Sequence, residues 1–310
     1  MKSKVVITDW GFPSLDPERE VLTPLGVEVE AFQCKTEDDV VRVVAGADVV
    51  MAQWAPVREK AISAMGRCKG IVRYGIGLDN IDLDVAAKKG IPVRNVPDYC
   101  LDEVADHTMA LLLSLQRQVT SVFQQVKAGV WKITPPLALL PLRQSTLGLV
   151  GFGRIARLVA LRARSFGLRI VAYDPMANPS VFAETGVGSL SLERVLAESD
   201  IVSLHCPLTP ETKHIINTET LKKMKPSSLL VNTSRGGLVE TDAVVEALRR
   251  GDLAGAALDV FEQEPLPQDH PFLTLSTAIA TSHNAWYSSA SVGQLQRKAA
   301  LAALELLQRP

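Results

Sequence analysis

The sequence predicts an α/β protein made of two doubly wound parallel-sheet domains. Short β-branched runs alternate with helix-length segments along nearly the whole chain, which is typical of parallel strands joined by crossover helices. The 310 residues also exceed the roughly 250 at which a single core usually stops growing. Hydrophobic residues make up 47% of the chain and charged residues 22%, which argues against a disordered, collagen-like or coiled-coil protein.

Strands and helix starts can be placed in the first hundred residues. The expected strands are residues 4–8, 27–31, 48–52, 70–74 and 92–94. Asp16 followed by Pro17 indicates a helix with Asp16 as its N-cap, and Gly26 lies where a left-handed residue should end that helix. Thr36 with Asp39 indicates a second helix start.

A second series of strands follows a long amphipathic helical segment at residues 102–127. Its expected strands are residues 146–150, 169–173, 201–204, 228–232, 254–259 and 278–281, with helices near 154–165, 192–197, 219–224 and 241–249. A last helix spans residues 289–308. Because chain ends often lie close together, we expect residues 289–310 to join residues 1–100 in a discontinuous first domain, with residues 101–288 as the second.

Charge and hydropathy exclude several partners. Thirty-three basic and 34 acidic residues leave a net charge of −1 without a basic stripe, so nucleic acid is not an expected partner. The longest apolar stretches, residues 109–115 and 137–142, are far shorter than the roughly 20 residues that cross a membrane. The N-terminus lacks the apolar core of a signal peptide, so we expect a cytoplasmic protein.

Cysteine spacing and acid spacing indicate no metal. The four cysteines are scattered without a C-x-x-C pair, so we expect reduced thiols rather than a zinc site. Three aspartates lie close together at Asp79, Asp82 and Asp84, but Asp82 or Asp84 at a helix start is the simpler explanation.

A glycine turn gives the most informative local signal. A strand runs into Gly151 and Gly153, and a helix follows at once with Ala156 in the third position of a G-x-G-x-x-A fingerprint. Gly151 permits the tight turn, Gly153 lets the backbone approach a pyrophosphate, and Ala156 keeps the helix close to the strand. Asp174 lies about 20 residues further on, where a carboxylate can accept from both ribose hydroxyls of NAD and repel a 2′-phosphate.

Two other interpretations of this motif stay open at this point. The turn could be an empty Rossmann-like turn, with Asp174 capping a loop before Pro175. It could also belong to a methyltransferase, because such enzymes place a glycine turn before an acidic residue that holds a ribose.

Three further segments are expected at the carboxyl edge of the second sheet, where ligands bind in such folds. They contain Arg235, the acidic pair Glu262 and Glu264, and His283. An arginine can form paired hydrogen bonds to a carboxylate, a histidine can move a proton near neutral pH, and a carboxylate can orient that imidazole. The set suits reduction of a carbonyl group.

By these residues the chain resembles the D-isomer-specific 2-hydroxyacid dehydrogenase family, which includes phosphoglycerate, glycerate and formate dehydrogenases and the C-terminal-binding proteins. The resemblance covers nearly the whole chain. Its most specific portions are the run from Gly151 to Ala156, residues 231–239 (VNTSRGGLV), and residues 255–261 (GAALDVF) with Glu264-Pro265. It implies a Rossmann NAD-binding domain inserted in a flavodoxin-like substrate domain.

The resemblance also implies roles for individual residues. His283 protonates the substrate carbonyl while hydride passes from the nicotinamide, Glu264 supports His283, and Arg235 holds the 2-oxoacid. Asp259 faces the nicotinamide, and Trp286 walls the substrate pocket. The loop that supplies backbone N–H groups to the substrate carboxylate is Arg73, Tyr74, Gly75, Ile76 and Gly77. Further implied cofactor contacts are Thr108, Arg154, Ile155, Cys206, Pro207, Thr212, Thr233, Ser234 and Ala285.

Several alternatives remain at this stage. Glu262 or solvation competes with Glu264 for the role beside the histidine, His107 is expected to be a packed or interface residue, and His214 and His270 are expected at the surface. Ile76 stands where many relatives carry a small or hydroxyl residue, which bears on substrate fit.

The expected partners are a small 2-oxoacid or 2-hydroxyacid and a second copy of the chain, because residues 102–127 and 131–142 exceed what one nucleotide-binding unit needs to cover its sheet. An NAD-sensing corepressor or scaffold, like the C-terminal-binding proteins, is the alternative function. The sequence does not name the 2-hydroxyacid.

Overall fold

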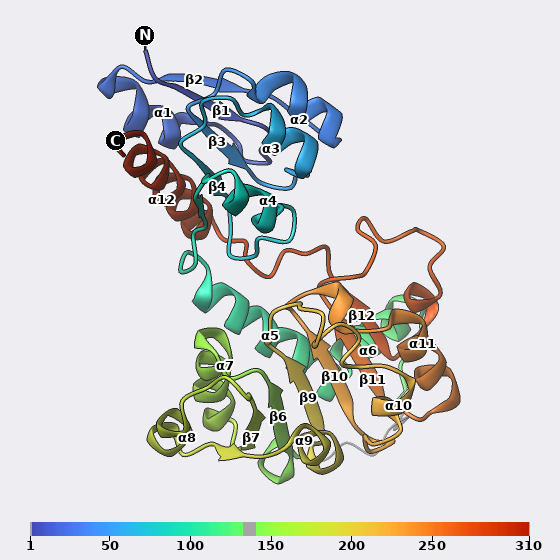
Figure 1. Ribbon diagram of the computed structural model, residues 1–310. Coiled ribbons are helices and arrows are strands. Elements are labelled where there is room, and N and C mark those ends of the chain that lie inside the picture. The colour runs from blue at the N-terminus through green and yellow to red at the C-terminus, as the bar shows by residue number, and fades with distance from the viewer. Residues whose placement is uncertain (1, 133–140, 310) are drawn as a thin grey trace. The chain divides into compact units, whose positions relative to one another are not determined.

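The computed structural model describes residues 2–132 and 141–309 (Figure 1). The chain divides into two compact units. The first unit comprises Met1–Cys100 with Tyr287–Pro310, and the second unit comprises Leu101–Trp286.

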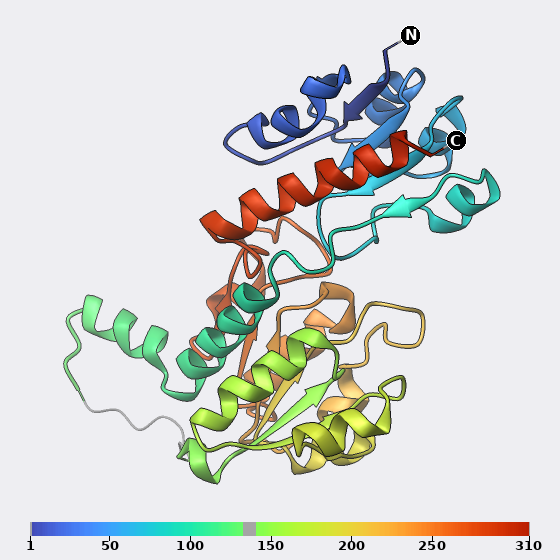
Figure 2. The ribbon, with the colours of Figure 1, turned by 90° about the vertical axis from the view of Figure 1, so that its left-hand side faces the viewer.

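The first unit is a five-stranded parallel sheet covered by helices. Its strand order is β2-β1-β3-β4-β5, which is the flavodoxin-like order. The strands are β1 (Lys4–Ile7), β2 (Glu28–Ala31), β3 (Val49–Ala52), β4 (Gly70–Arg73) and β5 (Val93–Arg94). The helices are α1 (Asp16–Leu22), η1 (Thr23–Leu25), α2 (Glu37–Val44), α3 (Glu59–Ala64), α4 (Leu83–Lys88) and α12 (Ser289–Leu307). The C-terminal helix α12 packs against α1, β3 and β4, as Figure 2 shows in red.

The helix starts of this unit agree only in part with expectation. Thr36 and Asp39 form a reciprocal capping box at α2, and Asp82 caps α4 by accepting from the Val85 N–H. Asp16 was wrongly expected as an N-cap. Leu15 occupies that position without a side-chain cap, so that Asp16 is the first helical residue and Pro17 follows it in the first turn, where proline needs no N–H partner.

A buried polar cluster joins three elements of the first unit. The carboxyl of Glu18 on α1 accepts from the Tyr74 hydroxyl at 2.9 Å and from Gln296 Nε2 on α12 at 2.9 Å. Burial raises the pKa of Glu18, and the two hydrogen bonds oppose that rise. Gln296 also donates to the carbonyl of Ser14. These contacts hold Tyr74, the residue directly after β4, inside the unit.

The second unit is a seven-stranded parallel sheet of order β12-β11-β10-β9-β6-β7-β8. Its strands are β6 (Thr146–Val150), β7 (Arg169–Tyr173), β8 (Gly188–Ser189), β9 (Ile201–Leu204), β10 (Leu229–Asn232), β11 (Gly255–Leu258) and β12 (Ala278–Ala280). The chain order reverses between β6 and β9, which is the point where doubly wound sheets bind ligands. Two such sheets in one chain confirm the expected fold class.

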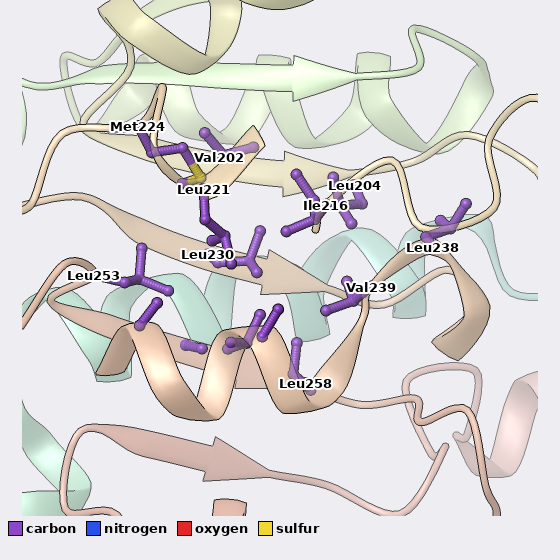
Figure 3. Packing of buried hydrophobic residues seen from close by; sticks show 14 of the residues in the cluster. Val202, Leu204, Ile216, Leu221, Met224, Leu230, Leu238, Val239, Leu253 and Leu258 are labelled. Carbon is purple, nitrogen blue, oxygen red and sulfur yellow. The ribbon is translucent and has the colours of Figure 1, made fainter. Parts of the chain in front are cut away.

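Helices cover both faces of the second sheet. They are α5 (Leu101–Gln116), α6 (Val119–Lys127), η2 (Leu142–Gln144), α7 (Arg154–Ser165), α8 (Pro179–Thr185), α9 (Leu192–Glu198), α10 (Thr218–Leu221), η3 (Gly236–Leu238), α11 (Thr241–Arg250) and η4 (Pro271–Thr274). Figure 3 shows part of the core on one face, where Val202 and Leu230 of neighbouring strands lie close to Leu221 and Met224. The short elements α8 and β8 were not expected from the sequence.

The single long helix expected over residues 102–127 is instead two helices. Gln118 adopts a left-handed conformation, with φ of 52°, and separates α5 from α6. The apolar periodicity continues across this break, so that it could not reveal the bend. Helix α5 has many buried residues, whereas α6 has none and stands away from the sheet (Figure 2). No helix in the described part of the chain is long and apolar enough to span a bilayer.

The Glu18 cluster leads to a stability prediction. Gln296→Leu keeps the side-chain volume but removes two donors, so we expect the free energy of unfolding to fall by about 1–3 kcal/mol. The hydrogen bonds from Gln296 lower the pKa of Glu18 in the folded protein, so this pKa is higher in the variant. The folded variant therefore loses stability as pH rises through that pKa. Urea unfolding should therefore show a larger loss at about pH 8 than at about pH 5. Gln294→Leu, at an exposed position of the same helix, is the control, and an equal loss in both variants would contradict the role of the cluster.

Candidate active site

The glycine turn lies between β6 and α7, at the reversal point of the second sheet. Gly151 has φ of +90°, and a Cβ added there would lie 2.6 Å from the Cys206 amide nitrogen, so only glycine fits. Gly153 is the N-cap of α7, and a Cβ added to it would meet no atom within 4 Å. Ala156 is fully buried between helix and sheet. The turn therefore has open space in front of helical N–H groups, which fits a pyrophosphate.

Asp174 binds the same turn from the end of β7. Its Oδ2 accepts from the Phe152 N–H at 2.8 Å, and its Oδ1 accepts from the N–H groups of Met176 at 2.9 Å and Ala177 at 3.1 Å. A carboxylate has about four acceptor positions, so Oδ2 retains one for a ribose hydroxyl. These residues fit a dinucleotide, while Arg154 and Ile155 lie in the first turn of α7.

The segment after β9 carries the next expected cofactor contacts. Burial raises the pKa of the Cys206 thiol to about 11, so this side chain is a neutral thiol and not a nucleophile at neutral pH. Burial also lowers the pKa of His205 to about 4, and its ring contacts the Ser203 hydroxyl at 2.9 Å. Thr212 donates to the carbonyl of Pro207 at 2.7 Å, which closes this loop.

Arg235 lies on a tight loop after β10. The side chain of Asn232 donates to the Arg235 carbonyl at 2.8 Å and accepts from the Ser234 N–H at 3.0 Å. A Cβ added to Gly236 would lie 1.9 Å from the carbonyl carbon of Phe261, so this loop lies directly against the segment after β11. Thr233 meets Thr108 of α5 through a buried hydroxyl pair at 2.8 Å.

Asp259 joins the loops that follow β11 and β12. Its carboxylate accepts from the N–H groups of Asn284 at 3.1 Å and Ala285 at 3.0 Å, and its carbonyl accepts from the His283 N–H at 2.8 Å. Burial raises the pKa of Asp259, but the nearby His107 ring and the hydrogen bonds from Thr281 and the two amides outweigh it and hold the pKa below its usual value. Asp259 is therefore a buried anion that shapes the histidine loop.

His283 is held in one orientation by Glu264. The Nδ1 atom of His283 lies 2.7 Å from Glu264 Oε2, and Glu264 Oε1 accepts from the Phe261 N–H at 2.9 Å. Burial raises the pKa of Glu264, but the hydrogen bond and charge of His283 outweigh it and lower that pKa. His283 has φ of 54°, an unusual backbone conformation that is common at functional sites. Trp286 stays close by donating from Nε1 to the His283 carbonyl at 2.9 Å.

Glu262 has a different partner. Its Oε1 lies 2.6 Å from His214 Nε2, and its Oε2 accepts from the Thr241 N–H at the start of α11. The geometry thus places Glu264, and not Glu262, beside His283. His214 and His270 are both partly exposed, and His270 Nδ1 accepts from the Phe272 N–H at 3.2 Å.

Sequence reasoning missed the contact made by His107. This α5 residue was expected to be packed or at an interface, but its Nε2 lies 3.1 Å from Thr281 Oγ1 and 3.6 Å from Asp259 Oδ1. Nothing in the local pattern of α5 distinguishes this histidine from a structural one, because its partner is 174 residues away in the chain.

The loop expected to bind a substrate carboxylate follows β4 in the first unit. The N–H of Tyr74 donates to the Ala52 carbonyl and that of Gly75 to the Arg73 carbonyl, so these two groups are already used. The Tyr74 ring is buried. Ile76 and Gly77 are left as the residues whose N–H groups suit the expected role. Among the described residues, no group of three or more His, Cys, Asp or Glu side chains could hold a metal ion.

Comparisons with known proteins identify the family. The family model for the NAD-binding domain of D-isomer specific 2-hydroxyacid dehydrogenases matches residues 109–285. A glyoxylate reductase of Korarchaeum cryptofilum is 42% identical over 255 residues, which is 81% of this chain and 76% of that protein. A D-3-phosphoglycerate dehydrogenase of Methanocaldococcus jannaschii is 36% identical over 308 residues, 99% of this chain but 57% of that protein.

A solved structure agrees over both units. The crystal structure of D-lactate dehydrogenase from Aquifex aeolicus, in complex with NAD and lactic acid, is 30% identical in sequence to this chain and has a TM-score of 0.89. The match covers 98% of this chain and 95% of that one. These relatives favour neither methyl transfer nor a corepressor. The chain therefore belongs to the D-isomer specific 2-hydroxyacid dehydrogenase family and is an NAD-dependent oxidoreductase that acts on the CH–OH group of a 2-hydroxyacid.

Proposed function

We propose that this chain reduces a small 2-oxoacid to the D-2-hydroxyacid with NADH, and that His283 donates the proton. The observation that carries the proposal is the Glu264–His283 pair, in which Nδ1 is occupied by a carboxylate at 2.7 Å and Nε2 remains the proton-donating atom. In this proposal residues 1–100 and 289–310 form the substrate domain, and residues 101–288 hold the cofactor.

The chain's own residues divide the work as follows. Bound NADH supplies the hydride. The N–H groups at the start of α7 bind the pyrophosphate, and Asp174 Oδ2 accepts from the ribose. Arg235 forms two parallel hydrogen bonds to the substrate carboxylate, which a point charge would not provide. The Ile76 and Gly77 N–H groups are a second proposed contact for that carboxylate.

His283 and Glu264 act as one unit in the proton step. The imidazolium donates from Nδ1 to Glu264 Oε2 and gives its Nε2 proton to the carbonyl oxygen as that oxygen becomes an alkoxide. The Glu264 carboxylate compensates the positive charge of the His283 imidazolium before the proton is transferred. In the oxidative direction the neutral imidazole receives the proton from the hydroxyl group.

For the substrate we propose a two-carbon or three-carbon 2-oxoacid, with glyoxylate first. The support is the 42% identity with a protein named as a glyoxylate reductase. NADH oxidation should be measured with glyoxylate, pyruvate, hydroxypyruvate and longer 2-oxoacids. We expect kcat/KM to be highest for a short member, and Arg235→Lys to lower it by more than about tenfold. Absence of turnover with every 2-oxoacid would refute the proposed function.

We also propose that the enzyme works in the cytoplasm. Each of the four cysteines is a thiol in the structure, which suits a reducing compartment.

A homodimer is the proposed assembly, and α6 provides its support. Val119, Val122, Phe123 and Val126 recur at helical spacing and are 56%, 43%, 57% and 42% exposed. Trp131 beyond the helix is 90% exposed. Helical spacing places these side chains on one face, and soluble monomers seldom leave such a face open to water. Of the expected apolar stretch 131–142, residues 133–140 lie outside the described residues.

Light scattering tests the assembly. We expect a mass of twice the 33.6 kDa chain at micromolar concentration, and the Phe123→Glu variant should shift it toward the single chain because a charge is placed on the apolar face. Leu161→Glu, at a 63% exposed position of α7, is the control and should stay dimeric. A wild-type mass of one chain would contradict the dimer.

Cofactor selectivity depends on Asp174. Because its carboxylate repels a 2′-phosphate, we expect kcat/KM to favour NADH over NADPH in the wild type. Asp174→Asn keeps the side-chain shape and removes the charge, so it should weaken the binding of NADH. The ratio of kcat/KM with NADH to kcat/KM with NADPH should fall by about tenfold or more. Equal efficiency of the wild type with both cofactors would contradict this assignment.

The pH dependence tests Glu264. The carboxylate stabilises the imidazolium, so reduction should persist at low pH and decline as pH rises, and oxidation should show the opposite limb. Glu264→Gln removes the charge and should move both limbs of the kcat/KM–pH profiles to lower pH. At neutral pH the variant should therefore lose more kcat/KM for reduction than for oxidation.

Glu262→Gln is the matched control, because that carboxylate contacts His214 instead. The measurement is kcat/KM against pH in both directions. Unmoved limbs in Glu264→Gln, or an equal shift in Glu262→Gln, would show that Glu264 does not support His283.

A further inference from the structure

We propose that His107 is a positioning residue, which holds the loop that carries His283 through a hydrogen-bonded chain of Thr281 and Asp259. His107 is on α5, outside the matched residues 109–285 of the family model. Its side chain is 22% exposed, so most of the imidazole is packed within the second unit. The inference rests on the proposed function of His283 as proton donor.

The hydrogen bonds in this chain are continuous. His107 Nε2 lies 3.1 Å from Thr281 Oγ1, which lies 2.5 Å from Asp259 Oδ1. Asp259 in turn accepts from the amides of Asn284 and Ala285. The carbonyl of Asp259 accepts from the amide of His283 itself. Each link is therefore one hydrogen bond from the next.

The direction of each hydrogen bond follows from the charge of Asp259. Its pKa is held below the usual value, so the carboxylate is ionised and can only accept. Thr281 has one hydroxyl hydrogen and gives it to Asp259. The Thr281 oxygen must then accept from His107, which requires a proton on His107 Nε2. The environment thus selects one tautomer of His107, and a donor at this position is the required property.

The purpose of such a chain is geometric. Proton transfer to a carbonyl oxygen needs the donor within hydrogen-bond reach, and His283 lies on an irregular loop with an unusual backbone angle. Without the His107 donor, the Thr281 hydroxyl keeps only one of these two hydrogen bonds, so it is held less firmly against Asp259. The loop would then sample positions in which His283 Nε2 is misplaced.

Four variants test this inference. His107→Leu and Thr281→Val break the hydrogen-bonded chain. His107→Gln retains a donor and Thr281→Ser retains a hydroxyl at the same place. We expect kcat to fall by about tenfold to 100-fold in the first two variants, with KM for NADH within about threefold of wild type. His107→Gln and Thr281→Ser should recover most of kcat.

The double variant His107→Leu with Thr281→Val should be no slower than the slower single variant, since both remove the same chain. A merely structural histidine would give additive losses and no rescue by glutamine. Either of these outcomes would overturn the proposal, and thermal unfolding of each variant identifies any loss caused by misfolding.

Amide hydrogen exchange provides a readout that does not need turnover. The amides of His283, Asn284 and Ala285 should exchange faster in His107→Leu than in the wild type, while His107→Gln should stay close to the wild type. If the wild-type enzyme reduces no 2-oxoacid, the proposed function fails, but amide hydrogen exchange still tests the hydrogen-bonded chain from His107 to Asp259. Unchanged exchange in His107→Leu would refute the role of His107 whatever the substrate.

Discussion

The buried carboxylate of Asp259 is the interaction on which the candidate site depends. It follows β11 and accepts from groups of the loop after β12, so that two strand ends of the second sheet are joined at one anion. A buried charge is costly unless its hydrogen bonds are satisfied, and here Thr281 and two amides satisfy it. The histidine loop is therefore shaped by the need to neutralise this carboxylate.

Acidic residues of the second unit show how similar side chains take different roles by position. Asp174 accepts from the amide of Phe152 and fixes the glycine turn, and Glu262 supports the start of α11. Glu264 contacts the imidazole ring of His283. Since each carboxylate is held by backbone N–H groups, its direction is set by the local chain rather than by solvent.

In the expected substrate-binding loop of the first unit, several groups are also held by hydrogen bonds inside the protein. The Tyr74 side chain is held in the interior by Glu18, and the N–H groups of Tyr74 and Gly75 are used within the unit. The resemblance named five residues in this loop. An amide that already donates inside the protein has no second proton to offer, so the N–H groups of Tyr74 and Gly75 do not suit this role, and Ile76 and Gly77 are the candidates that follow them in the loop.

The sequence by itself determined the two parallel α/β sheets, most strand positions, the glycine turn with Asp174, and the three segments at the strand ends. These features depend on local patterns: apolar runs mark strands, and glycines permit a turn that other residues cannot adopt. The local pattern was insufficient at Gln118, where apolar periodicity continues through a bend, and at the weak elements α8 and β8.

The family resemblance named Glu264 as the partner of His283, but only the tertiary structure gives the geometry of the acid–histidine pairs and shows the pairs that the sequence did not name. Glu264 and His283 are 19 residues apart, Glu262 and His214 are 48 apart, and His107 and Thr281 are 174 apart. Such pairs are set by strand order and by the path of each loop, which no local signal contains. Glu262 and Glu264 differ by two positions in the chain, yet the fold directs one to the start of a helix and the other to His283.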